Sequence, residues 1–188
     1  MRNLQLIIAD TLEAIDGPTE ELTPELVDEV LRPAKENMQK VIQSASMIEH
    51  ILEDIIRFYF FGNDSGTKEA REKFVSLILT TDWFSFGIKR KLMEQIINDK
   101  ELITGNEKNK YFKLLHQTIA TRNAFVHGTF STDGRVVKLS YYQGAPKEQM
   151  LSEIYLSSTE AILNECFQIS QQLAFAIGAY TVHADEPH

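Results

Sequence analysis

The feature that most constrains the fold is a long apolar stripe between about residues 34 and 61. Its members recur every three or four residues, as on one face of a helix, and the pattern holds until Gly62. Met38, Ile51 and Ile56 widen the stripe, which is typical of a helix buried on more than one side. A chain organised around such a helix is predicted to be mostly helical. The stripe consists of Val41, Ala45, Ile48, Leu52, Ile55 and Tyr59.

Shorter segments with the same spacing occupy most of the remaining chain. Thr23 followed by Pro24 resembles an N-cap with proline in the first helical turn, and it predicts a short helix ending near Leu31. Asp82 is the expected N-cap of the helix that follows it. The other predicted helices cover residues 3–16, 67–80, 83–98, 107–127 and 158–182.

The apolar spacing changes to a period of two late in the chain. Val137 and Leu139 alternate with polar residues, as do Ile154 and Leu156, which predicts a β-hairpin of about 135–142 and 150–156. We therefore expect an all-α domain with a small late β-hairpin. Its predicted parts are an N-terminal helical extension at residues 1–33, a helical domain at 34–182 and a flexible tail at 183–188.

The composition is that of an ordinary globular protein and excludes several classes. A net charge of -8 over 188 residues excludes a basic, histone-like binder of bulk nucleic acid. Cys166 is the only cysteine, so we expect neither a disulfide framework nor a thiolate zinc site. Because no apolar stretch reaches the roughly 18 residues of a membrane span and nothing resembles a signal peptide, we expect a cytoplasmic protein without a membrane partner.

Positive charge is concentrated in one part of the chain. Residues 83–138 contain ten basic and five acidic side chains, a balance of +5, so the remainder carries -13. This part could attract a phosphate backbone locally. The alternative is that these lysines are ordinary solvent-exposed residues on the surfaces of helices.

The segment Arg122–Gly128 is the most informative motif, because it combines three chemically useful side chains at the end of a predicted helix. Arg122 carries a permanent positive charge and a planar set of donors suited to phosphate oxygens. His127 is the side-chain type best able to exchange a proton near neutral pH, and Asn123 can fix an orientation by hydrogen bonding. Gly128 stands where a left-handed C-terminal cap is common. Together they could promote attack of an RNA 2′-hydroxyl on its own phosphodiester without a metal.

The spacing of this motif makes a homodimer part of the hypothesis. Five residues span about 500° of a regular helix, so Arg122 and His127 point about 140° apart. They converge only if the last helical turn unwinds, or if a second copy of the helix faces the first across a two-fold axis.

Arg122–Gly128 resembles the Arg-x4–6-His signature of HEPN domains, including the asparagine that commonly follows the arginine. The segment 46–53 is similar to the first core helix of these domains. The resemblance implies an up-and-down helical bundle, often dimeric, and in many members a metal-independent endoribonuclease of toxin–antitoxin or defence systems. It carries Arg122, His127 and Asn123 over as catalytic residues, with Glu49 or Glu53 as supporting acidic neighbours. RNA as substrate, a second copy, a cognate antitoxin or partner protein, and no cofactor or metal are expected.

Some members of this family are not nucleases, which leaves a second hypothesis open. In a nucleotide-binding, RNA-binding or protein-interaction module, Arg122 and Asn123 would only cap the helix and bridge to Glu49 or Glu53. The sequence also favours non-catalytic positions for the other candidates: His50 at the flank of its helix, His116 partly buried and Cys166 in the core.

Overall fold

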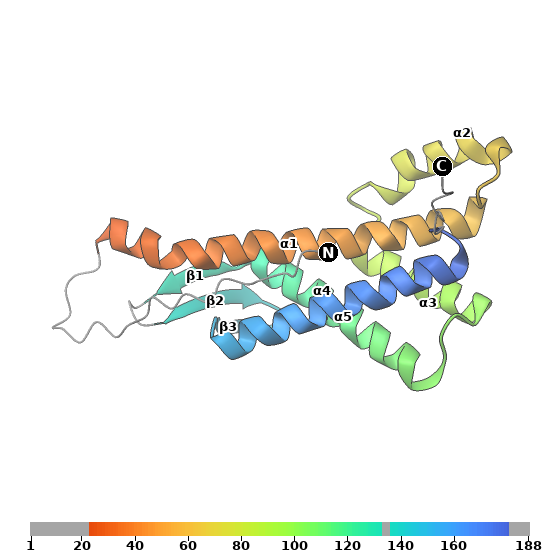
Figure 1. The fold of residues 1–188 in the computed structure, drawn as a ribbon. Coiled ribbons are helices and arrows are strands. Elements are labelled where there is room, and N and C mark those ends of the chain that lie inside the picture. Colours follow the sequence, from red (N-terminus) through yellow and green to blue (C-terminus); the bar gives the residue numbers. More distant parts are fainter. Residues whose placement is uncertain (1–22, 133–135, 181–188) are drawn as a thin grey trace, which may run out of the picture. The chain divides into compact units, whose positions relative to one another are not determined.

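The computed structural model describes residues 23–132 and 136–180 (Figure 1). Most of these residues are helical, and a small antiparallel sheet lies late in the chain, which confirms the mostly helical fold with a late β element. None of the helices within these ranges is long and apolar enough to cross a membrane. In chain order the elements are α1 (Pro24–Phe61), η1 (Ser65–Thr67), α2 (Lys68–Phe74), the π-helical turn η2 (Val75–Leu79), α3 (Phe86–Lys100), α4 (Gly105–His127), β1 (Thr129–Thr132), β2 (Val137–Tyr142), β3 (Pro146–Met150) and α5 (Glu153–Ile177).

Helix α1 is longer than the sequence pattern predicts. Thr23 caps it as expected, because its Oγ1 accepts a hydrogen bond of 3.4 Å from the backbone N–H of Leu26. The helix then continues through Pro33, so the two helices predicted at about 24–31 and 34–61 form a single helix. Proline removes one backbone donor from a helix interior, but Leu31 and Ala34 beside it are buried, and their packing outweighs that loss. The helix predicted at residues 3–16 and the tail at 183–188 lie outside the described residues.

Helix α3 begins later than predicted. Asp82 is not its N-cap; the helix starts at Phe86, and Ser85 occupies the cap position. The reason is a turn in which the N–H of Phe84 bonds the carbonyl of Thr81 at 3.0 Å, so that the chain is not yet helical at residue 82.

Residue contacts divide the chain into two compact units, and each has its own core. The first unit contains the described residues up to Ala45 and from Gln117 to Asn164; the second contains Ser46–His116 and the described residues from Glu165 onward. Buried side chains in the first unit include Leu31, Val41, Phe125, Leu139, Leu156 and Leu163. Those of the second include Ile48, Leu52, Ile55, Ile96, Ile97, Tyr111, Leu115 and Cys166.

The sheet belongs to the first unit and differs from the predicted hairpin. Strand β2 matches the expected alternation, but it lies between two antiparallel partners, β1 and β3. The second strand predicted at 150–156 is wrong, because Ile154 and Leu156 belong to the first turn of α5. Ser152 starts this helix by accepting the N–H of Tyr155 on its Oγ at 3.3 Å. The apolar residues Ile154 and Leu156 are two positions apart, as on one face of a strand. In the helix they point in different directions, so that Ile154 is 80% exposed and Leu156 is buried.

Gly128 joins α4 to β1 through close packing. It does not adopt the positive φ of a left-handed cap, so the conformational role expected from sequence is wrong. Instead, a Cβ at this position would lie 2.5 Å from Cδ1 of Leu139 and 3.0 Å from the carbonyl oxygen of Ser140, and it would also meet the carbonyl oxygen of Ala124. Glycine is therefore required where the end of α4 lies against β2.

Gly128→Ala is expected to lower the free energy of unfolding by about 1–3 kcal/mol, because two of the three clashing atoms are backbone atoms that cannot rotate away. Urea unfolding followed by circular dichroism measures the loss. Gly87→Ala is the matched control: it lies in α3, its Cβ would meet only Ser85 Oγ at 3.8 Å, and it should leave stability unchanged or slightly raised. Equal effects of the two substitutions would contradict the packing role of Gly128.

Candidate functional site

The three motif side chains lie in the last two turns of α4. Arg122 is half-buried, whereas Asn123 and His127 are exposed. Nη1 of Arg122 donates a hydrogen bond of 3.1 Å to Oδ1 of Asn123, so the asparagine orients the guanidinium as its companion. Within the part of the chain that the structure describes, no carboxylate pairs with Arg122, which leaves its remaining donors available to an anion.

The motif is held rigidly by its apolar members. Ala124 and Phe125 are buried, and the ring of Phe125 lies 6.1 Å from the ring of Phe130 in β1. Together with the tight contact at Gly128, this packing fixes both the helix end and the strand that follows it. His127 is thus presented to solvent from a fixed backbone.

The helix remains regular to its last residue, and this decides how the motif can work. Helix α4 includes His127, so its last turn does not unwind. At about 100° per residue, Arg122 and His127 therefore point about 140° apart within one chain. Of the two ways in which these side chains were expected to converge, unwinding of the last helical turn does not occur.

Glu49 and Glu53, the expected supporting acids, lie in the second unit and pair with a lysine that sequence reasoning missed. Nζ of Lys89 lies 2.7 Å from Oε1 of Glu49 and 2.5 Å from Oε1 of Glu53. The lysine side chain is only 5% exposed, and the carboxylates 20% and 15%. A signal was present in the sequence, because Lys89 occupies an inward position of α3 between the buried Phe86 and Met93. A lysine in such a position requires anionic partners.

Glu53 has a second partner at the surface. Its Oε2 lies 2.9 Å from Nδ1 of His50, an exposed side chain one turn earlier in α1. Because a carboxylate can only accept, Nδ1 carries the proton and Nε2 of a neutral His50 is left as an acceptor. His50 thus lies at the flank of the apolar face of α1, as expected, and one of its ring nitrogens is hydrogen-bonded to Glu53. His116, by contrast, is exposed rather than partly buried.

Other potential reactive groups do not form a second centre. Across residues 23–132 and 136–180, no three His, Cys, Asp or Glu side chains are arranged to hold a metal ion. Cys166 is fully buried in the second core, as predicted. No family model, curated protein or solved structure matches the chain.

Proposed function

We propose that this chain is a metal-independent endoribonuclease of the HEPN type that acts as a homodimer. The observation that carries the proposal is an arginine with no carboxylate partner in the described chain, five residues before an exposed histidine at a rigid helix end. In a chain with 27 acidic and 19 basic residues, an arginine free of carboxylates is suited to bind an external anion. A phosphodiester is the anion that arginine and histidine together can process.

Each residue has a distinct role in the proposed reaction. His127 takes the proton from the RNA 2′-hydroxyl, or returns one to the departing 5′-oxygen, as general base or acid. Arg122 neutralises the charge that develops on the phosphate oxygens, and Asn123 holds its guanidinium in place. The 2′-oxygen bonds to phosphorus as the phosphorus–5′-oxygen bond breaks, giving a 2′,3′-cyclic phosphate and a 5′-hydroxyl.

The exposed side of the motif supports dimerisation. Asn123, Val126 and His127 lie within about 100° of one another around α4, and Val126 is a 37% exposed apolar residue at one edge of this sector. A two-fold contact along this side would bury Val126 and bring the motif of one copy to the motif of the other. The proposal includes the finer fold of this family, an up-and-down helical bundle, and a cytoplasmic role in a toxin–antitoxin or defence system with a cognate antitoxin.

The alternative of a non-catalytic module is less well supported. It needs Arg122 as a structural partner of an acid such as Glu49 or Glu53. Both carboxylates already pair with Lys89, and Glu53 also pairs with His50, so neither is an unpaired acid that requires Arg122.

The proposal predicts that His127→Ala lowers the rate of RNA cleavage by about 10²–10⁴-fold, because the proton-transfer group is lost. The measurement is cleavage of mixed-sequence single-stranded RNA by purified wild type and variant in EDTA, with analysis of the product ends. His116→Ala is the matched control, since this histidine is also exposed on α4 and should be dispensable. Cleavage that needs a divalent metal, or that persists in His127→Ala, would contradict the proposal. Absence of cleavage by wild type would favour the interaction module.

A further inference from the structure

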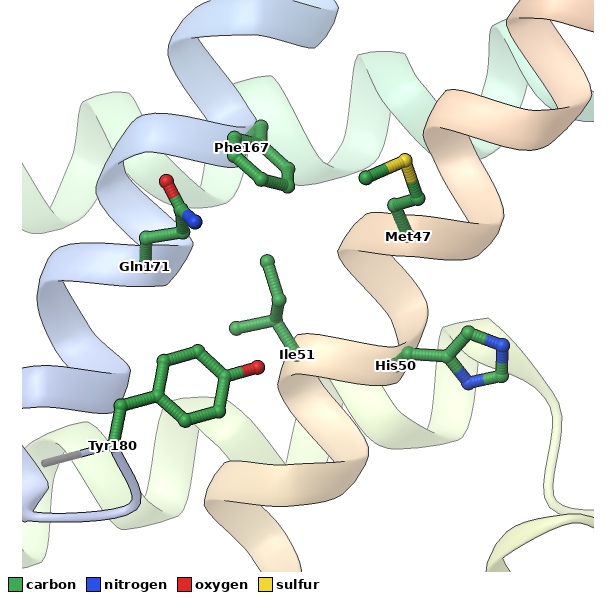
Figure 2. A pocket seen from close by; sticks show the side chains of 6 residues that line it. All are labelled: Met47, His50, Ile51, Phe167, Gln171 and Tyr180. Atoms are coloured by element: carbon green, nitrogen blue, oxygen red, sulfur yellow. The ribbon is translucent and has the colours of Figure 1, made fainter. Parts of the chain in front are cut away.

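A small pocket in the second unit is separate from the residues used above. Its volume is about 280 Å³, and it lies between α1 and α5 beside Tyr180, which follows α5 (Figure 2). This volume is just below the roughly 300 Å³ at which ligand sites for drug-sized molecules begin, so it suits a single ring system rather than a whole nucleotide. The lining residues are Met47, His50, Ile51, Phe167, Gln171 and Tyr180.

The lining is suited to a flat ring. Ile51 and Phe167 are buried and give the pocket an apolar wall from each helix, while the 38% exposed Met47 stands at its rim (Figure 2). Phe167 and Tyr180 contribute aromatic rings, and the Met47 thioether is a favourable neighbour for a third ring. A planar aromatic ligand would therefore gain more contact here than a branched aliphatic one.

Two polar groups, those of Gln171 and Tyr180, face this apolar lining, whereas the ring of His50, the third polar lining residue, points away from them (Figure 2). Among the described residues, the carboxamide of Gln171 has no hydrogen-bond partner, so it can both donate to and accept from a ligand. The hydroxyl of Tyr180 donates to Oδ2 of Asp54 at 3.0 Å, and burial together with that bond raises the pKa of Tyr180 to about 12. The Tyr180 hydroxyl therefore stays protonated, directs its O–H to Asp54 and offers an oxygen lone pair to the pocket.

The charge of the lining excludes a strongly anionic ligand. Among the residues that the structure describes, no lysine or arginine lines the pocket. The neighbouring Asp54 pairs with Arg57 at 2.9 Å, and Glu53 shares Lys89 with Glu49 and also pairs with His50, so both acids already have partners within the protein. A phosphate would find no lysine or arginine among these lining residues, whereas an uncharged ring has no charge to desolvate.

We propose that this pocket binds an uncharged, amino-bearing aromatic heterocycle, of which adenine is the common biological example. The pocket offers one donor and two acceptors, counting the Gln171 amide and the Tyr180 hydroxyl, and this set complements a ring edge that carries an amino group beside a ring nitrogen. Glutamine can bond such an edge through both atoms of its amide. Uracil presents a ring N–H between two carbonyl acceptors; Gln171 could bond the N–H and one carbonyl, but that carbonyl would then lie opposite the Tyr180 lone pair, which is another acceptor. The inference does not depend on RNA cleavage, because it uses different residues.

The test is a titration of the full chain with adenosine and with uridine, followed by nuclear magnetic resonance shifts of the side-chain amides. Adenosine should bind, uridine should bind more weakly, and Gln171→Leu should weaken adenosine binding by at least about tenfold through loss of the paired hydrogen bonds. Gln172→Leu is the matched control, because this adjacent glutamine is exposed and does not line the pocket.

A second arm distinguishes a free heterocycle from the same base in RNA. The His127→Ala chain is titrated with short oligoadenylate and oligouridylate, so that any cleavage is removed from the measurement. Binding of oligoadenylate alone, lost in Gln171→Leu, identifies an RNA base as the ligand. Unchanged binding in Gln171→Leu, or no binding of either adenine-containing probe, would overturn the proposal whatever the outcome of the cleavage experiment.

Discussion

Lys89→Met is expected to lower the free energy of unfolding by about 3–5 kcal/mol. The substitution removes the cation that lies 2.7 Å from Glu49 and 2.5 Å from Glu53, and it leaves two carboxylates of like charge on adjacent turns of α1. Both carboxylates are at least four-fifths buried, so water cannot fully replace the lysine. The cost arises from uncompensated charge rather than from lost packing, because methionine fills a similar volume.

Urea unfolding measures this effect, and two further variants identify its cause. Lys91→Met changes an exposed lysine of the same helix and should alter stability by no more than about 0.5 kcal/mol. The triple variant Lys89→Met, Glu49→Gln, Glu53→Gln should recover most of the loss, because no buried charge remains without a partner. If the triple variant were as unstable as Lys89→Met alone, the charge explanation would be wrong.

The sequence predicted those parts of the fold where a local pattern and the tertiary packing agree. The apolar stripe around Ile48 and Leu52 marks α1 because its helical face is the buried face. The alternation at Val137 and Leu139 marks β2 for the same reason, since Leu139 is buried and its neighbours are not. The end of α4 at His127 was likewise predicted, because Gly128 follows it.

Other parts could not be predicted because a local signal competes with packing. Pro33 indicates a helix boundary, but the buried residues on either side keep α1 continuous. The spacing of Ile154 and Leu156 indicates a strand, although Ile154 is exposed in the structure. The hydrogen bond from the N–H of Tyr155 to Ser152 is what identifies the start of a helix. Lys89 lies 40 residues after Glu49 and 36 after Glu53 in the sequence. Helical spacing predicts contacts only between residues three or four apart, so it could not predict this one.

The candidate site shows the same division. The residues Arg122, Asn123 and His127 and their place at a helix end follow from the sequence. Whether Arg122 and His127 could meet within one chain depended on the last turn of α4, and a periodic pattern does not report whether one terminal turn stays regular. Because that turn is regular, the proposed reaction requires the arginine of one copy and the histidine of the other.

This requirement predicts complementation between two inactive variants. Arg122→Ala and His127→Ala homodimers should each lose about 10²–10⁴-fold in RNA cleavage. A heterodimer of the two variants contains one composite site with both residues intact and one with neither. It should therefore regain about half of the wild-type rate, since one of the two symmetric sites is restored.

A reciprocal heterodimer separates this arrangement from a site built within one chain. When wild type is paired with the double variant Arg122→Ala, His127→Ala, each composite site lacks one residue, so this dimer should be as inactive as the single variants. If Arg122 and His127 instead acted from the same chain, the two results would exchange: the reciprocal dimer would keep half of the activity and the complementing dimer would have none. Differently tagged copies, purified by both tags and assayed in EDTA, provide the measurement. Since all four chains keep the packing at Phe125 and Gly128, a difference between the two heterodimers reports where the reacting residues come from, not how well the protein folds.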